Sequence, residues 1–183
     1  MQALGAFWTG GYAGTSLDEL SDATGMNRPS LYLAFGDKRT LYLKALEQYW
    51  RASAEAMRTA LAPDVPLPEA LMRVYRTALS FYFPKTGQPR GCFAISTAAP
   101  AAIEDAEIRS MFAEGLARLD AAFERRIALA QAQGELSDTA DPASLAQMAS
   151  ATLHSLAIRA RAGMPKRTLE AFARDAVAMI CGR

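Results

Sequence analysis

The sequence has few of the residues that build β-sheets. Of its 183 residues only three are valine and six are isoleucine, whereas 38 are alanine. Because valine and isoleucine favour strands and alanine favours helices, this composition predicts an all-α fold. It argues against a sandwich, a barrel or a parallel-sheet enzyme. The sequence also lacks any apolar run of about 18 residues, so we expect no membrane span and no membrane partner.

Histidine and cysteine are scarce as well. His154 is the only histidine, and Cys92 and Cys181 lie far apart, outside any CxxC pattern. A single histidine excludes a His-rich metal site and would have to be the only base of a Ser-His-Asp or Cys-His enzyme. We therefore expect no enzyme activity, no metal and no cofactor. Two unpaired cysteines and the lack of a secretion signal indicate a cytoplasmic protein.

Cys92 admits two interpretations. It lies beside Arg90 at the start of an expected short helix, where a thiolate is favoured and a reactive sensor cysteine would fit. The competing interpretation is burial as a small apolar side chain, and the frequency with which cysteine is buried favours it.

Glycine and proline divide the chain into about nine helical segments. The first ends at Gly10 and Gly11. Ser16 and Asn27 are suitable N-cap residues for the next two, and Glu19 has the capping-box spacing from Ser16. We expect the later helices over residues 38–61, 69–83, 92–99, 105–133, from 142 to about 162, and from about 166 onward.

Residues 16–35 have the pattern of two short helices joined by a tight turn. Leu17, Leu20 and Leu31 would form the small core between the helices, and Gly25 supplies the backbone freedom of the turn. The outer part of the second helix is then free to enter the major groove of B-DNA, with its N-terminal residues toward the base edges. The formal net charge is only +1, so any DNA contact must depend on a local patch.

The motif extends on both sides of this pattern. The string FWTGGYAGTSL from Phe7 to Leu17, followed by GMNRPSLYLAFGDK from Gly25 to Lys38, resembles the DNA-binding domain of the tetracycline-repressor (TetR) family. The resemblance implies a homodimer with a C-terminal ligand pocket and, usually, transcriptional repression. It also implies that DNA is faced by Ser16, Arg28, Pro29, Ser30, Tyr32, Leu33 and Lys38.

The same resemblance implies two domains. We expect a three-helix helix-turn-helix domain over residues 1–46 and a helical bundle for effector binding and dimerisation over residues 47–183. Family members usually carry an additional, often basic, arm before the first helix. This sequence begins inside that helix and shows no such arm, which leaves three explanations open: a trimmed chain, a start at a late methionine, or a true lack of the arm.

Apolar residues of the C-terminal part form two further candidate sites. An aromatic- and Met-rich group suits an adaptable apolar pocket, although for any single member an ordinary bundle core is the competing interpretation. The group is Tyr75, Leu79, Tyr82, Phe83, Cys92, Phe93, Met111, Phe112 and Met148. The last two helices each carry more than one apolar stripe and therefore need a second partner. The predicted dimer interface is Leu153, Leu156, Ala157, Ala160, Leu169, Phe172, Ala176 and Met179.

These features predict a ligand-responsive DNA-binding transcriptional regulator. We expect a repressor that a small, mostly apolar effector releases from a palindromic operator. Its partners would be double-stranded DNA, the effector and a second copy of the chain. A helical small-molecule carrier, or an enzyme that uses the C-terminal pocket, is the alternative. Residues 28–38 favour the regulator, because neither alternative needs an exposed recognition string there.

Overall fold

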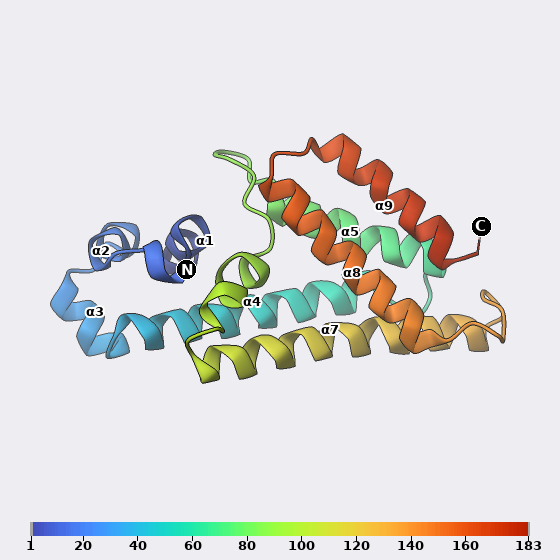
Figure 1. Cartoon of the computed structure of the whole chain (residues 1–183), viewed down its shortest axis with the longest axis horizontal. Helices are drawn as coiled ribbons and strands as arrows, with labels where there is room; N and C mark the ends of the chain where they lie inside the picture. The colour runs from blue at the N-terminus through green and yellow to red at the C-terminus, as the bar shows by residue number, and fades with distance from the viewer. Residues whose placement is uncertain (1, 183) are drawn as a thin grey trace. The chain divides into compact units, whose positions relative to one another are not determined.

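The computed structural model describes residues 2–182, which are helical with connecting turns and contain no strand (Figure 1). This confirms the all-α prediction. The helices are α1 Gln2–Gly14, α2 Leu17–Thr24, α3 Arg28–Phe35, α4 Lys38–Ala60, α5 Leu67–Tyr82, the π-helical η1 Ala94–Ala98, α6 Ala99–Ala101, α7 Ala106–Ala132, α8 Pro142–Arg161 and α9 Lys166–Ile180. Within the described range no helix is long and apolar enough to cross a membrane.

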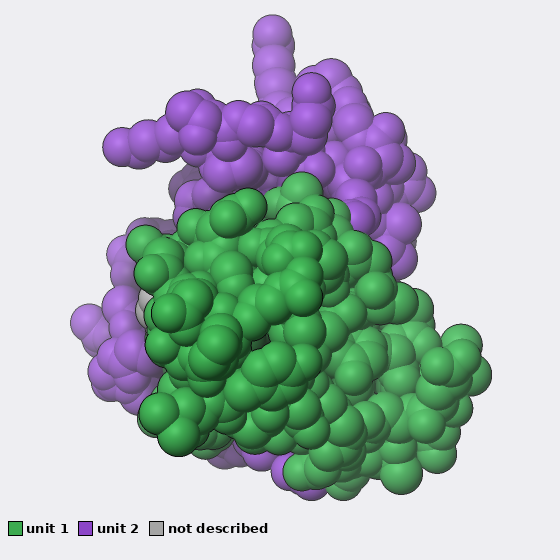
Figure 2. Space-filling model, turned by 90° about the vertical axis from the view of Figure 1, so that its left-hand side faces the viewer, with its two compact units in different colours: residues 1–52, 93–113 green, residues 53–92, 114–183 purple. Residues whose placement is uncertain are grey.

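The helices gather into two compact units, coloured green and purple in Figure 2. The first unit holds residues 1–52 and 93–113, and the second holds residues 53–92 and 114–183. The sequence predicts two domains that are each continuous along the chain, whereas each compact unit combines two segments. The predicted boundary after residue 46 stays a prediction. The outer limits of the predicted domains, residues 1 and 183, lie outside the described residues.

Local side chains start the helices of the first unit where the sequence predicts. The Ser16 hydroxyl accepts the Glu19 N–H at 3.2 Å, and the Glu19 carboxylate accepts the Ser16 N–H at 2.7 Å, which is a complete capping box. The Asn27 side chain accepts the Ser30 N–H at 2.9 Å. Gly25 ends α2 with φ 67°, a left-handed conformation that glycine adopts without strain. The turn between α2 and α3 is therefore encoded locally.

Two predicted helix ends differ from the structure. α1 continues to Gly14, although Gly11, with φ 75° and ψ 173°, interrupts the helical path inside it. The helix expected over residues 92–99 is instead η1 followed directly by the one-turn α6, which contains Pro100. Proline fits there because the N–H groups in the first turn of a helix have no partner within the helix.

An aromatic cluster forms the core of the first unit. The Tyr42 ring meets the Phe7 ring edge-on with centroids 5.2 Å apart, and Trp8 meets Phe93 in the same way at 5.6 Å. The Tyr42 and Thr97 hydroxyls lie 2.7 Å apart, and burial raises the pKa of Tyr42 to about 12. The cluster fixes the start of α4 against α1 and η1, and so determines where the chain leaving α3 is held.

The second unit is built on α5, α8 and α9. α8 and α9 run antiparallel and side by side, joined by a short turn (Figure 1). Leu79, Leu156 and Leu169 are fully buried in this unit, and the Tyr75 hydroxyl donates to the Ala149 carbonyl at 3.2 Å. One apolar stripe of α8 and one of α9 are therefore already buried by packing within the single chain.

A buried arginine links α7 to the start of α5. Arg126, whose side chain is 2% exposed, donates from Nη2 to the Val65 carbonyl and contacts a Glu135 oxygen at 3.3 Å. The other Glu135 oxygen accepts the Leu67 N–H at 2.6 Å, which satisfies a donor at the N-terminus of α5. Arg126 Nε and Nη1 find no partner among the described residues. Glu135 is thus the only described anion that compensates this buried charge.

Gly91 is expected to tolerate no side chain. It has φ 65°, and an added Cβ would lie 2.5 Å from the Ala157 carbonyl oxygen. Strain and a clash with backbone should together lower the free energy of unfolding of Gly91→Ala by about 3 kcal/mol. Gly87→Ala is the control, since Gly87 also has positive φ but has open space around it, and should cost about 1 kcal/mol. Urea unfolding measures both, and equal losses would contradict the clash.

Candidate nucleic-acid interface

α3 presents one face to the protein and leaves the other bare. Leu31 is buried beside α2, whereas Leu33 is 92% exposed and Tyr32 is 48% exposed. Leu33 therefore contributes almost nothing to packing within the chain, and about half of Tyr32 is open to solvent. Apolar side chains in this position can contact the methyl group of thymine in the major groove.

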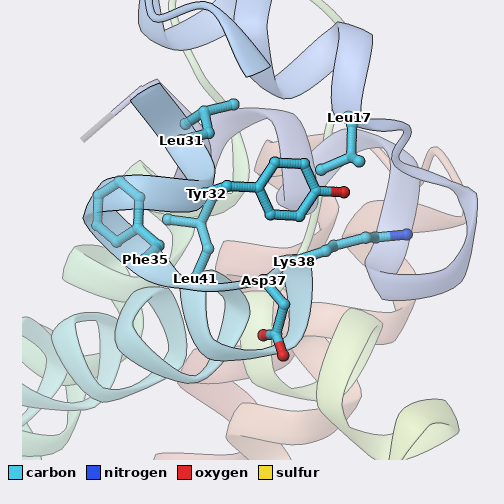
Figure 3. Close-up of a pocket in the computed structure, with 7 residues that line it drawn as sticks. All are labelled: Leu17, Leu31, Tyr32, Phe35, Asp37, Lys38 and Leu41. Atoms are coloured by element: carbon cyan, nitrogen blue, oxygen red, sulfur yellow. The ribbon is translucent and has the colours of Figure 1, made fainter. Parts of the chain in front are cut away.

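A small hollow lies where α2, α3 and α4 meet (Figure 3). Its lining is Leu17, Leu31, Tyr32, Phe35, Asp37, Lys38 and Leu41. Its free volume of about 10 Å³ holds no more than a water molecule, so it is not a ligand pocket. In Figure 3 the Tyr32 hydroxyl and the Lys38 ammonium point to the same side, opposite to Phe35. A hydroxyl and a cation at one rim suit a phosphate group.

Lys38 is held in place by the end of α1. Its Nζ donates to the Ala13 carbonyl at 3.2 Å and lies 5.2 Å from the centroid of the Tyr12 ring. Partial burial lowers the pKa of Lys38 from its usual value. Beside it, Asp37 caps α4 by accepting the Thr40 N–H at 2.6 Å, and this hydrogen bond lowers the pKa of Asp37. Lys38 is thus positioned before any ligand arrives.

Arg28, the first residue of α3, pairs with Asp18 in the first turn of α2. Arg28 Nε donates to Asp18 Oδ1 at 2.7 Å, and Arg28 Nη2 donates to Asp18 Oδ2. This hydrogen bonding lowers the pKa of Asp18 and raises that of Arg28. Both side chains remain exposed. Sequence reasoning singled out Arg28 but missed Asp18, because the two are ten positions apart and lie on different helices.

The neighbouring cation, Arg39, forms ion pairs with two acidic residues of the first unit. Its guanidinium contacts Asp105 at 2.5 Å and Glu107 at 2.8 Å. The guanidinium lowers the pKa of Asp105 to about 2, and hydrogen bonds from the first N–H groups of α7 act in the same direction. Of the adjacent cations Lys38 and Arg39, only Lys38 therefore stands at the rim of the hollow.

The remaining DNA-facing residues of the prediction occupy the starts of α2 and α3. Ser16 is exposed and caps α2, Pro29 is exposed in the first turn of α3, and the Ser30 side chain is half-buried. The structure therefore places all seven predicted residues in one unit, on α3 and on the adjoining starts of α2 and α4. Their contact with DNA stays a prediction.

The predicted pocket residues divide between the two units. Phe93, Met111 and Phe112 belong to the first unit and the other six to the second. The buried members are Tyr75, Leu79, Tyr82, Cys92 and Phe93. Phe83, Met111 and Phe112 are half-buried, whereas Met148 is exposed. The pocket stays a prediction, and the burial of Cys92 agrees with its interpretation as a packed apolar residue.

The predicted dimer residues divide by exposure. Those already buried within the single chain are Leu153, Leu156, Ala157, Ala160 and Leu169. Phe172 and Ala176 are half-buried, and Met179 is 73% exposed. Sequence reasoning did not assign Ile158, which is 58% exposed on α8, to the interface. A partner would therefore meet the outer faces of α8 and α9, and the interface stays a prediction.

Two short helices at a tight turn, the second bare on its outer face, define a helix-turn-helix protein. The family described as bacterial regulatory proteins, tetR family, matches residues 2–45. The family described as tetracyclin repressor-like, C-terminal domain, matches residues 68–176. The chain therefore belongs to the TetR family, as the motif predicts.

Individual relatives agree with this assignment. The HTH-type transcriptional repressor ComR of Escherichia coli is 27% identical over 162 residues, which cover 88% of this chain and 77% of ComR. A solved structure of the TetR family regulator CifR with 26-bp operator DNA is 27% identical, with a TM-score of 0.86 over 96% of this chain and 92% of CifR. A TetR regulator from Rhodococcus sp. RHA1 is 30% identical, with a TM-score of 0.67 over 98% and 95% of the two chains.

Proposed function

We propose that the chain is a dimeric transcriptional repressor that binds operator DNA through α3 and is released by a small, mostly apolar effector. The observation that carries this proposal is the bare face of α3, which has Arg28 at its start and Lys38 just beyond its end. ComR is named a repressor, and CifR was solved with operator DNA, which supports the same role here. A bacterial regulator of this kind binds the chromosome, so we propose that the protein is cytoplasmic.

In this proposal α3 enters the major groove with its N-terminal residues toward base edges. Leu33 meets apolar groups in the groove, while Tyr32 and Lys38 hold a phosphate at the rim of the hollow. Residues 1–50 contain four basic and five acidic side chains, so the net charge of this segment gives no attraction for DNA. Affinity then depends on where individual cations lie, and Lys38 is the best placed.

Effector release follows from linkage. α4 runs from Lys38 at the recognition end into the second unit, so one continuous helix belongs to both units. An effector bound among Tyr75, Leu79 and Tyr82 would favour a conformation in which two α3 helices no longer match successive major grooves. The alternative carrier or enzyme leaves the exposed surface of α3 without a use, so we propose that the chain has no enzyme activity.

Lys38→Ala is expected to weaken binding to every DNA sequence by a similar factor. Loss of one phosphate contact should reduce the slope of log K against log salt by about one unit. Lys44→Ala is the matched control: Lys44 is an exposed lysine on α4 with its Nζ 5.4 Å from the Phe35 ring centroid. Fluorescence anisotropy with a labelled duplex between about 50 and 200 mM salt measures both slopes. Equal slopes for Lys38→Ala and the unmodified chain would remove Lys38 from the interface.

A further inference from the structure

Among the described residues, Asp18 is the acidic side chain that pairs with Arg28 at the start of α3. A carboxylate beside a DNA-binding helix is unfavourable, since it repels phosphates and competes for the arginine that should meet DNA. Asp18 nevertheless engages Arg28 with two oxygens in the parallel, bidentate geometry that gives the strongest and most directional pairs. Such a pair between exposed side chains adds little to stability, so stability alone does not explain it.

The atoms involved explain what the pair can do. Asp18 takes the edge of the guanidinium formed by Nε and Nη2. It leaves the end formed by Nη1 and the second hydrogen of Nη2, which is itself a two-pronged donor. Guanine offers two acceptors, O6 and N7, at the matching spacing in the major groove. An arginine whose first edge is held by a carboxylate therefore has its second edge fixed in direction before DNA arrives.

We propose that Asp18 is a positioning residue that aims the free end of Arg28 at a guanine of the operator half-site. The proposal deepens the proposed function and rests on it. Arg28 reads the base, and Asp18 restricts the rotamers of Arg28 and neutralises part of its charge. The complex then gains sequence discrimination at the expense of general attraction to phosphates.

The test begins with duplexes that the unmodified chain selects from a random DNA library. Each guanine of the best duplex is replaced in turn by 7-deazaguanine, which lacks the N7 acceptor, and anisotropy measures affinity. The unmodified chain should lose about 5- to 150-fold in affinity at one guanine of each half-site. Arg28→Ala should lose this penalty entirely.

The variant Asp18→Asn distinguishes positioning of Arg28 by Asp18 from simple repulsion between the Asp18 carboxylate and DNA phosphates. If Asp18 positions Arg28, this variant should bind a shuffled duplex as well as or better than the unmodified chain. Its penalty for 7-deazaguanine should fall at least threefold. A carboxylate that only repels DNA would give tighter binding to every duplex with the penalty intact, and this result would overturn the proposal. Asp22→Asn, which removes the same charge from an exposed position on α2, should keep the penalty.

The two proposals fail in different ways. A chain that selects no duplex overturns both the proposed function and the role of Asp18. A chain that selects duplexes in which no guanine substitution matters overturns only the role of Asp18. Circular dichroism checks that Asp18→Asn folds, and Asp18→Glu, which keeps the charge at a longer reach, should restore part of the guanine penalty.

Discussion

Replacing Met179 with glutamate should split the dimer and weaken operator binding at least a hundredfold. Met179 is 73% exposed on α9 of the single chain, so the variant chain can fold with its carboxylate in water. In a dimer formed by the outer faces of α8 and α9, that carboxylate would be buried without a partner, which is strongly unfavourable. A monomer also loses the gain of about 10²–10⁴ that comes from binding two half-sites together.

Arg174→Gln is the control for Met179→Glu, because it changes the net charge by the same amount. Arg174 is exposed on α9, five positions earlier and about 140° away around the helix axis. Light scattering should give twice the chain mass of 19.7 kDa for the unmodified chain and for Arg174→Gln, and the single mass for Met179→Glu. A Met179→Glu chain that remains a dimer with unchanged operator affinity would place the interface elsewhere.

Removing the Glu135 carboxylate should lower the free energy of unfolding by about 3 kcal/mol. Glu135→Ala leaves the buried Arg126 without its only described anionic partner, and a buried charge deprived of its partner typically costs about 3–5 kcal/mol. It also leaves the Leu67 N–H at the start of α5 without its acceptor. We expect the low end of the range because the Glu135 side chain is still 24% exposed.

A second variant separates the charge effect from simple loss of packing. Arg126→Met together with Glu135→Ala removes both charges and keeps an unbranched side chain in the buried position. It should be more stable than Glu135→Ala alone, because no buried charge is left uncompensated. Glu124→Ala, at an exposed position of α7, should change stability by no more than about 0.5 kcal/mol. Urea unfolding checks all three, and a double variant less stable than Glu135→Ala would contradict this role for Arg126.

The features that the sequence predicts well are those controlled by neighbouring residues. The cap at Ser16 and the turn at Gly25 need only a few consecutive side chains, and the structure has both where they are expected. The bare face of α3 follows from the same local pattern, because a short helix with one buried leucine must leave its other side chains outside.

The features that sequence reasoning missed depend on contacts between distant segments. Arg28 meets a carboxylate ten positions away, and Arg126 meets the carbonyl of Val65, 61 positions away. Helical periodicity also cannot tell which of two apolar stripes packs inside the chain. Leu156 and Leu169 have the expected spacing, yet they are buried within the second unit. The side chains left for a partner, such as Ile158, could be recognised only after that packing was known.

Sequence recognition by α3 is tested most directly by the affinity of the unmodified chain for its selected duplex, relative to a shuffled duplex of the same composition. Both are measured by anisotropy at about 150 mM salt, where non-specific attraction is screened. A dimeric helix-turn-helix regulator that reads bases through α3 should bind the selected duplex at least about a thousandfold more tightly. Equal affinities for the two duplexes would contradict sequence-specific recognition by α3, and with it the proposed function.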